Sequence, residues 1–282
     1  MSKLDTQALQ AWVGRQQSVT DVITAAPVGA LSASLDYPRP RAGAGEALPP
    51  LWHWLYFLPH VPASQLDVDG HALRGDFLPP VPLPRRMWAG SQVRFAAGLR
   101  VGDAVRRVST IESVAGKRGR SGELVFVTVL HRLLRDGELA VEERQRLVYR
   151  DAGAGSGAAP LPAPAPAQFE RTIMPDPVLL FRYSALTFNS HRIHYDRDYA
   201  TAVEGYPGLV VQGPLTATLL LDLLARELPA ARLTGFEFRA LQPVFAGAAL
   251  RLQGCRQGAS VALWALDAQG ALAMTASATL AG

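Results

Sequence analysis

The side chains best suited to chemistry lie in the segment FNSHRIH at positions 188–194. Its last residue, His194, carries an imidazole that accepts and donates protons near neutral pH, so it is a candidate general acid or base. Asn189 cannot transfer a proton, but its amide can hold a water molecule or a hydroxyl group in line. The backbone N–H of Gly213 falls at the start of a predicted helix, where unpaired donors can bind a developing oxyanion. The pattern predicts proton transfer beside a stabilised oxyanion.

Other interpretations of these histidines stay open at this point. A single histidine in a mixed helix or loop is commonly a structural residue. His191 lies three positions before His194 and would share a helix face with it. Such a His-x-x-His pair suggests a metal site, but no third ligand stands out in the sequence, so we expect no metal.

The second half of the chain supplies the elements that must position these residues. We expect a short strand at 180–189, leading into a polar turn, and a short helical stretch and loop at 190–204. Apolar residues at helical spacing predict a long helix within 208–228. Strands follow from residue 233 onward, with a hairpin turn at 267–270.

The first half repeats this order more weakly. Residues 23–36 can form a matching helix, and 94–114, 122–137 and 138–150 are predicted as strands. Each half thus predicts one helix lying across a curved antiparallel sheet. Two such units make an α+β double hot-dog fold, in which two antiparallel sheets are each wrapped around a central helix.

A compositional boundary separates the halves. Residues 151–167 are almost entirely Ala, Gly, Pro and Ser, which predicts an extended linker because such a stretch cannot bury enough surface to fold alone. We therefore expect an N-terminal module at 1–150 and a C-terminal module at 168–282.

Composition limits the class of protein. Hydrophobic residues make up 49% of the 282 positions and charged residues 18%, which argues against disorder. The net charge of +4 suits a polyanionic small molecule better than nucleic acid, since the arginines are scattered. A single cysteine, Cys255, excludes an internal disulfide. No apolar run has the length of a membrane span and no secretory leader is recognisable, so we expect a cytoplasmic enzyme.

The motif region resembles the MaoC-like hydratase/dehydratase family. The resemblance is strongest to its branch of 3-methylfumaryl-CoA (mesaconyl-C4-CoA) hydratases and mitochondrial-type 3-hydroxyacyl thioester dehydratases. It rests on the segments FRYSALTFNSHRIHYDRDYA, GYPGLVVQGPL, LPPLWHWLYFLP, GDFLPPVPLPRRMWAG and VEERQRLVYR. His194 falls on the family's catalytic histidine, whereas Asn189 stands where the family has a catalytic aspartate. Gln212 replaces the histidine of the second motif, His-Gly.

The resemblance implies a double hot-dog whose C-terminal module is catalytic and whose N-terminal module shapes an acyl pocket. It implies a hydro-lyase that adds water reversibly to a short, branched, dicarboxylic enoyl-CoA such as 3-methylfumaryl-CoA, giving citramalyl-CoA. His194 would carry both proton transfers, Asn189 would position the water, and Gly213 would bind the enolate oxygen. We expect no cofactor beyond the coenzyme A of the substrate, no nucleic acid or membrane partner, and a monomer or a homodimer.

A dicarboxylic substrate also needs a cation for its free carboxylate, which a guanidinium can bind through two hydrogen bonds. The candidates are Arg85 and Arg86, with Arg192 as a rival. Further residues that we expect at the substrate are Gln212, Tyr195 and Trp54.

Three alternative functions remain at this stage. They are a 3-hydroxyacyl-CoA or acyl-carrier-protein dehydratase for longer fatty acyl chains, a thioesterase, and a non-catalytic acyl-CoA-binding module. A deep apolar tunnel would favour the long-chain dehydratase, and a short pocket that ends in an arginine would favour the dicarboxylate.

Overall fold

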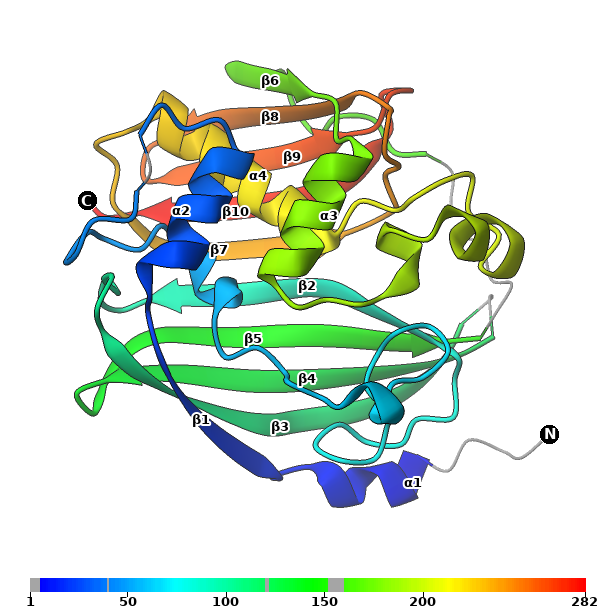
Figure 1. The fold of residues 1–282 in the computed structure, drawn as a ribbon. Helices are drawn as coiled ribbons and strands as arrows, with labels where there is room; N and C mark the ends of the chain where they lie inside the picture. Colours follow the sequence, from blue (N-terminus) through cyan, green and yellow to red (C-terminus); the bar gives the residue numbers. More distant parts are fainter. Residues whose placement is uncertain (1–5, 40, 120–121, 152–159) are drawn as a thin grey trace.

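The computed structural model of the protein describes residues 6–39, 41–119, 122–151 and 160–282. Over these residues, ten strands form one continuous antiparallel sheet in the order β1-β3-β4-β5-β2-β7-β10-β9-β8-β6 (Figure 1). The strands are β1 (Gln16–Val22), β2 (Arg85–Phe95), β3 (Ala104–Gly119), β4 (Gly122–Arg135), β5 (Glu138–Arg150), β6 (Phe169–Ile173), β7 (Leu233–Ala240), β8 (Leu250–Gln257), β9 (Ser260–Leu266) and β10 (Leu272–Leu280). The first five strands of the chain form one half of the sheet and the last five form the other, and β2 pairs with β7 where the halves meet.

The α-helices are α1 (Thr6–Leu9), α2 (Ala25–Ser34), α3 (Pro177–Leu186) and α4 (Gly213–Glu227). Helices α2, α3 and α4 lie in front of the half of the sheet that contains β7–β10, whereas α1 lies beside β3 in the other half (Figure 1). Helix α4 crosses β7–β10, with α2 and α3 on the same side, whereas loops of the first half lie in front of β2–β5 (Figure 1). Residues 215–224 of α4 are all buried, as expected for a helix enclosed between a sheet and other helices.

Strand periodicity explains how the sheet meets α4. In β7, Phe236 and Phe238 are almost fully buried, whereas Glu237 between them lies on the opposite face and pairs with Arg146. Alternate side chains of a strand point to opposite faces, so β7 presents its aromatic rings to the core. These rings, together with Leu215 and Leu220 of α4, belong to the main hydrophobic cluster of the protein.

The predicted α+β class is confirmed, and the two half-sheets are joined edge to edge instead of lying apart. The helix expected at 23–36 is present as α2, and the one expected within 208–228 is α4. The module boundaries at 150 and 168 stay predictions. Residues 152–159 of the proposed linker lie outside the described residues.

The expected strand at 180–189 is wrong, because this segment lies mostly in α3. Asp176 caps that helix through a 2.7 Å bond from the Leu179 N–H to its carboxylate. Leu180, Tyr183 and Ser184 are the buried positions of α3. This spacing of three and four residues gives a helix its buried face.

The single strand expected at 94–114 is also wrong. The segment contains the end of β2, a turn and the start of β3. Gly102 sits in the turn at φ +105°, a conformation that glycine adopts without strain. The hairpin turn at 267–270 is confirmed, with Gly270 at φ +86° between β9 and β10. No helix among the described residues is long and apolar enough to cross a membrane.

Candidate active site

His194 lies at the end of a short 3-10 turn, Arg192–His194, and is 7% exposed. Its Nδ1 is 2.7 Å from the carbonyl oxygen of Val210, just before α4. A carbonyl can only accept, so Nδ1 carries the hydrogen and Nε2 keeps a lone pair. Burial lowers the pKa of His194 to about 4, despite the opposing effect of this bond. His194 is therefore neutral near pH 7 and can act as a base through Nε2.

A cavity of about 1140 Å³ connects His194 with the start of α4. Gly213 opens that helix and lines the same cavity, so the first N–H groups of α4 lie at its wall. These groups have no partner within the helix and lie at the positive end of its dipole. The structure thus places His194 in the same cavity as Gly213, whose N–H is a donor suited to an oxyanion.

Gln212 holds this wall in place. Its Nε2 donates to the carbonyl oxygen of Leu180 at 3.0 Å and to the hydroxyl of Ser184 at 2.9 Å, which ties α3 to the start of α4. Its Oε1 is buried and has no hydrogen-bond partner among the described residues. Because the side chain also lines the cavity, this oxygen can accept a hydrogen bond from a bound molecule.

Asn189 shapes the turn that carries the motif. Its Oδ1 accepts the N–H of His191 at 3.1 Å, and its own N–H donates to the carbonyl oxygen of Ser184 at the end of α3. The preceding Phe188 has φ +48°. Such an Asx bond stabilises a tight turn. Since Asn189 lines the cavity, its Nδ2 can face a substrate, and the predicted role in positioning water stays a prediction.

Trp54 and Tyr195 both line the cavity, and their contact with a substrate stays a prediction. The Trp54 ring packs against Trp88 at 4.9 Å between centroids, and its Nε1 donates to Glu143 at 2.9 Å, so it is a rigid part of the wall. Tyr195 is half exposed, and its hydroxyl donates to the carbonyl oxygen of Ser190 at 3.1 Å. Tyr195 thus lies near the opening and stabilises the motif turn.

The three candidate arginines are not equivalent. Arg86 lines the cavity, whereas neither Arg85 nor Arg192 does. Arg85 is paired with Glu204 at 2.9 Å, and Arg192 with Asp196 at 2.7 Å. The expected roles of Arg85 and Arg192 in binding a substrate carboxylate are therefore not supported, because their charges are neutralised away from the cavity.

Arg86 keeps its charge available. Within the described part of the chain it makes no ion pair with a carboxylate. Its charge lowers the pKa values of His71 and His191, after the larger effect of their burial, so the guanidinium lies close to both imidazoles. Arg86 is therefore a cation that a substrate carboxylate can reach next to the motif, and Arg74 and Arg107 line the same cavity.

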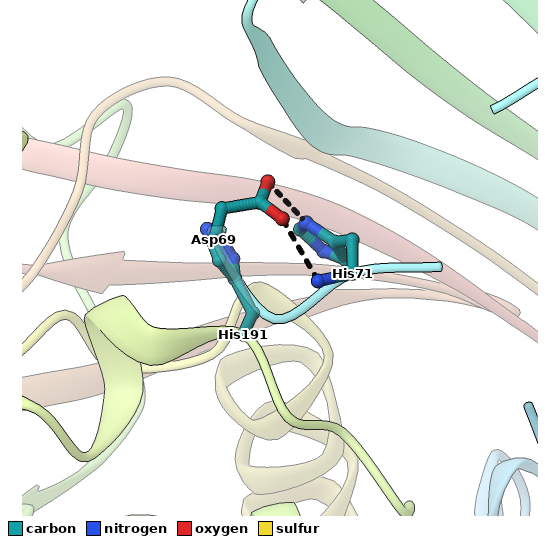
Figure 2. Close-up of side chains that lie close together, drawn as sticks. All are labelled: Asp69, His71 and His191. Atoms are coloured by element: carbon teal, nitrogen blue, oxygen red, sulfur yellow. Dashed lines mark hydrogen bonds and ion pairs between the residues drawn. The ribbon is translucent and has the colours of Figure 1, made fainter. Parts of the chain in front are cut away.

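The sequence analysis missed a cluster of Asp69, His71 and His191, shown in Figure 2. The Asp69 carboxylate accepts two bonds of 2.8 Å, from Nδ1 and from the backbone N–H of His71. Burial would raise the pKa of Asp69, but the bonds from His71 hold it below its usual range. In the sequence, this cluster is visible only as the triplet Asp-Gly-His at residues 69–71. The triplet does not indicate that its loop contacts the segment around His191, far along the chain.

The loop at 67–72 is attached to the motif through backbone contacts. The N–H of Arg192 donates to the carbonyl oxygen of Asp69 at 2.9 Å, and the hydroxyl of Ser190 donates to that of Gly70 at 2.5 Å. Gly70 has φ +88°, and a Cβ built there would lie 1.9 Å from the carbonyl oxygen of Ser190. Only glycine allows this approach between the N-terminal half and the motif.

Comparison with known proteins identifies the family. The sequence model of hydroxyacyl-thioester dehydratase type 2 matches residues 51–246. The chain belongs to this family. A mesaconyl-C(4)-CoA hydratase of Chloroflexus aurantiacus is 48% identical over 274 residues, which cover 96% of this chain and 98% of that protein. A mitochondrial hydroxyacyl-thioester dehydratase type 2 of Schizosaccharomyces pombe is 29% identical over 262 residues, or 82% and 87% of the two chains. The predicted branch is confirmed.

A solved structure supports the fold. A Mycobacterium tuberculosis protein described as a double hotdog fold matches with a TM-score of 0.60 at 14% identity, over 95% of this chain and 96% of that one. At this identity the likeness concerns the fold alone. It confirms the predicted double hot-dog.

Proposed function

We propose that this protein is a hydro-lyase that adds water reversibly to a short, branched, dicarboxylic enoyl-CoA, with mesaconyl-C4-CoA as the substrate to test first. The observation that carries the proposal is one cavity containing His194, the start of α4 at Gly213 and the available cation Arg86. The 48% identity to a mesaconyl-C(4)-CoA hydratase over almost the whole chain supports the same substrate class.

The site residues suit the addition of water to a conjugated thioester. The neutral Nε2 of His194 takes a proton from water as the water oxygen bonds to the β-carbon. The π electrons move onto the thioester oxygen, and the N–H of Gly213 stabilises the resulting enolate. A proton then adds to the α-carbon and gives the 3-hydroxyacyl-CoA. One preorganised donor of this kind contributes about 3 kcal/mol to transition-state stabilisation.

Turnover of purified protein with a panel of enoyl-CoA substrates tests the proposal. We expect loss of enoyl absorbance with mesaconyl-C4-CoA, slower turnover of crotonyl-CoA, which lacks the carboxylate, and little turnover of long-chain enoyl-CoA. Mass spectrometry should show a product heavier by one water. Binding without turnover of any panel member would contradict the proposal and support a binding module.

Arg86 is expected to bind the substrate carboxylate. Replacing it with methionine keeps most of the side-chain volume and removes the charge. We expect KM for mesaconyl-C4-CoA to rise about thirtyfold, which corresponds to about 2 kcal/mol for a charged hydrogen bond. Crotonyl-CoA kinetics should change little. Arg85→Met is the matched control, because Arg85 is paired with Glu204 outside the cavity. Equal losses on both substrates would argue against a carboxylate site.

A dehydratase for longer acyl chains is the second candidate, because a cavity of about 1140 Å³ exceeds what a five-carbon acyl group fills. The polar side chains of His53, His131 and Glu143 also line the cavity, however, and an apolar tunnel would not contain them. A preference for long-chain substrates in the panel would favour this candidate. A cytoplasmic location, a homodimer and the lack of any cofactor other than substrate coenzyme A remain part of the proposal.

A further inference from the structure

The motif carries Asn189 at the position where the resemblance to the wider MaoC-like family implies a catalytic aspartate, and an amide cannot take up a proton. His194 is held by a backbone carbonyl. An imidazolium that forms during the reaction in a buried site needs a nearby negative charge or another proton acceptor. The Asp69 loop supplies both, because His71 lines the same cavity and is bonded to the carboxylate of Asp69 behind it.

Asp69 and His71 have the geometry of an oriented acid/base pair. The carboxylate accepts the Nδ1 hydrogen of His71, which leaves the lone pair on Nε2, as in other carboxylate–histidine pairs. The side chains of His71 and Asp69 are 21% and 14% exposed. His71 lines the cavity, whereas Asp69 lies behind it and does not. Burial lowers the pKa of His71, so the imidazole is neutral at rest.

His191 connects this pair to His194. Its ring lies 4.0 Å from the ring of His71 and 5.3 Å from that of His194, between centroids. His71 belongs to the N-terminal half of the chain, whereas His194, like His191, belongs to the C-terminal half. All three imidazoles line the cavity. Three neutral imidazoles with one carboxylate at the end of the row can share one additional proton, because Asp69 stabilises the cationic form.

Resting on the hydratase function proposed above, we infer that Asp69 and His71 replace the missing aspartate, and that His71 delivers the proton to the α-carbon. Water loses a proton to Nε2 of His194 as its oxygen bonds to the β-carbon, and the enolate forms. The proton passes from His194 to His191 and then to His71. The enolate collapses and takes this proton from His71, which forms the α C–H bond and returns all three imidazoles to the neutral state. One water is added and no proton is gained or lost.

Asp69, His71 and His191 could in principle hold a metal ion. The hydrogen bond between His71 and Asp69 argues against this, because it already uses Nδ1 of His71 and one carboxylate oxygen of Asp69. The inference therefore assigns the cluster to proton transfer.

The test measures kcat and KM separately for His71→Gln and Asp69→Asn with mesaconyl-C4-CoA. We expect His71→Gln to lower kcat about a hundredfold, the usual scale for a general acid or base, with KM unchanged within a few-fold. Asp69→Asn keeps the imidazole and should lower kcat by a smaller factor. Asp67→Asn is the matched control for Asp69→Asn, because Asp67 lies in the same loop, accepts the N–H of Val68 and does not line the cavity. Dialysis against EDTA should leave the wild-type rate unchanged.

Thermal melting shows whether each variant is folded, and Asp69→Asn decides the outcome if His71→Gln does not fold. A folded His71→Gln variant with the wild-type kcat, or with a change in KM alone, overturns the inference. The inference is also overturned, in favour of a metal site, if dialysis against EDTA abolishes the activity and added zinc restores it. A wild-type protein that hydrates no enoyl-CoA overturns the proposed function and this inference together, whereas normal wild-type turnover with an unaffected variant overturns the inference only.

Discussion

Replacing His194 with alanine is expected to lower kcat about a thousandfold, which is within the range for loss of a general acid or base. The side chain is 7% exposed and lines the cavity, and its Nε2 keeps a lone pair because Nδ1 is bonded to the carbonyl oxygen of Val210. The backbone donors at Gly213 remain in the variant, so some stabilisation of the enolate should persist. We therefore expect a low residual rate with substrate binding largely retained.

His194→Gln separates proton transfer from packing. The glutamine amide fills much of the same space and can still donate to the carbonyl oxygen of Val210, but it cannot take up a proton. Both variants should be equally inactive, and steady-state kinetics with mesaconyl-C4-CoA measures this. A glutamine variant at more than a small fraction of the wild-type rate would show that His194 is a structural residue.

The pH dependence of the wild type gives a second measurement of the same role. The pKa of His194 is about 4, and only the neutral form accepts a proton, so kcat/KM should fall below about pH 4 and level off toward neutrality. Burial lowers the pKa of His131 to about 4 as well. Between pH 6.5 and pH 4 the unfolded chain binds protons that the folded protein does not, so stability also falls as the pH is lowered. Melting curves at each pH distinguish the two effects.

The sequence predicted the C-terminal half of the fold better than the N-terminal half. Helix α4 and the strands after residue 233 have strong periodic patterns, because each buries one regular face. Residues 180–189 are rich in apolar and aromatic side chains, which suggested a strand. The segment instead lies mostly in α3, because Asp176 caps that helix and its apolar residues recur at the spacing of a buried helix face. Local composition does not reveal which face of a segment will be covered.

Among the site residues, those close to the motif in sequence could be predicted and those brought by other elements could not. His194, Asn189, Gln212 and Gly213, which the two motifs indicated, all line the cavity, and their roles at the substrate stay predictions. Arg85 and Arg86 looked equivalent, but adjacent residues of a strand point to opposite faces, so only one of them lines the cavity. The pairing of Arg192 with Asp196 follows from helical spacing and was available from the sequence.

Gly70→Ala is expected to lower kcat about a hundredfold without replacing any reactive group, on the scale that an error of about 1 Å in positioning produces. An added Cβ would lie 1.9 Å from the carbonyl oxygen of Ser190, and backbone on both sides leaves no flexible group to move aside. The loop at 67–72 must then separate from the motif, which breaks the bond from Arg192 to Asp69 and displaces His71 from His191. Steady-state kinetics and thermal melting measure the two consequences.

Gly14→Ala provides the control for backbone strain. Gly14 has φ +86°, almost the same as Gly70, but no heavy atom of the described residues lies within 4 Å of a Cβ built there. Both variants should lose about 1–3 kcal/mol of stability from the strained conformation, whereas only Gly70→Ala should lose activity. Equal, near-normal rates would show that the motif does not need the Asp69 loop against it. A selective loss in Gly70→Ala would instead show that the catalytic half depends on a backbone contact made by the other half, because glycine is the residue that permits the contact.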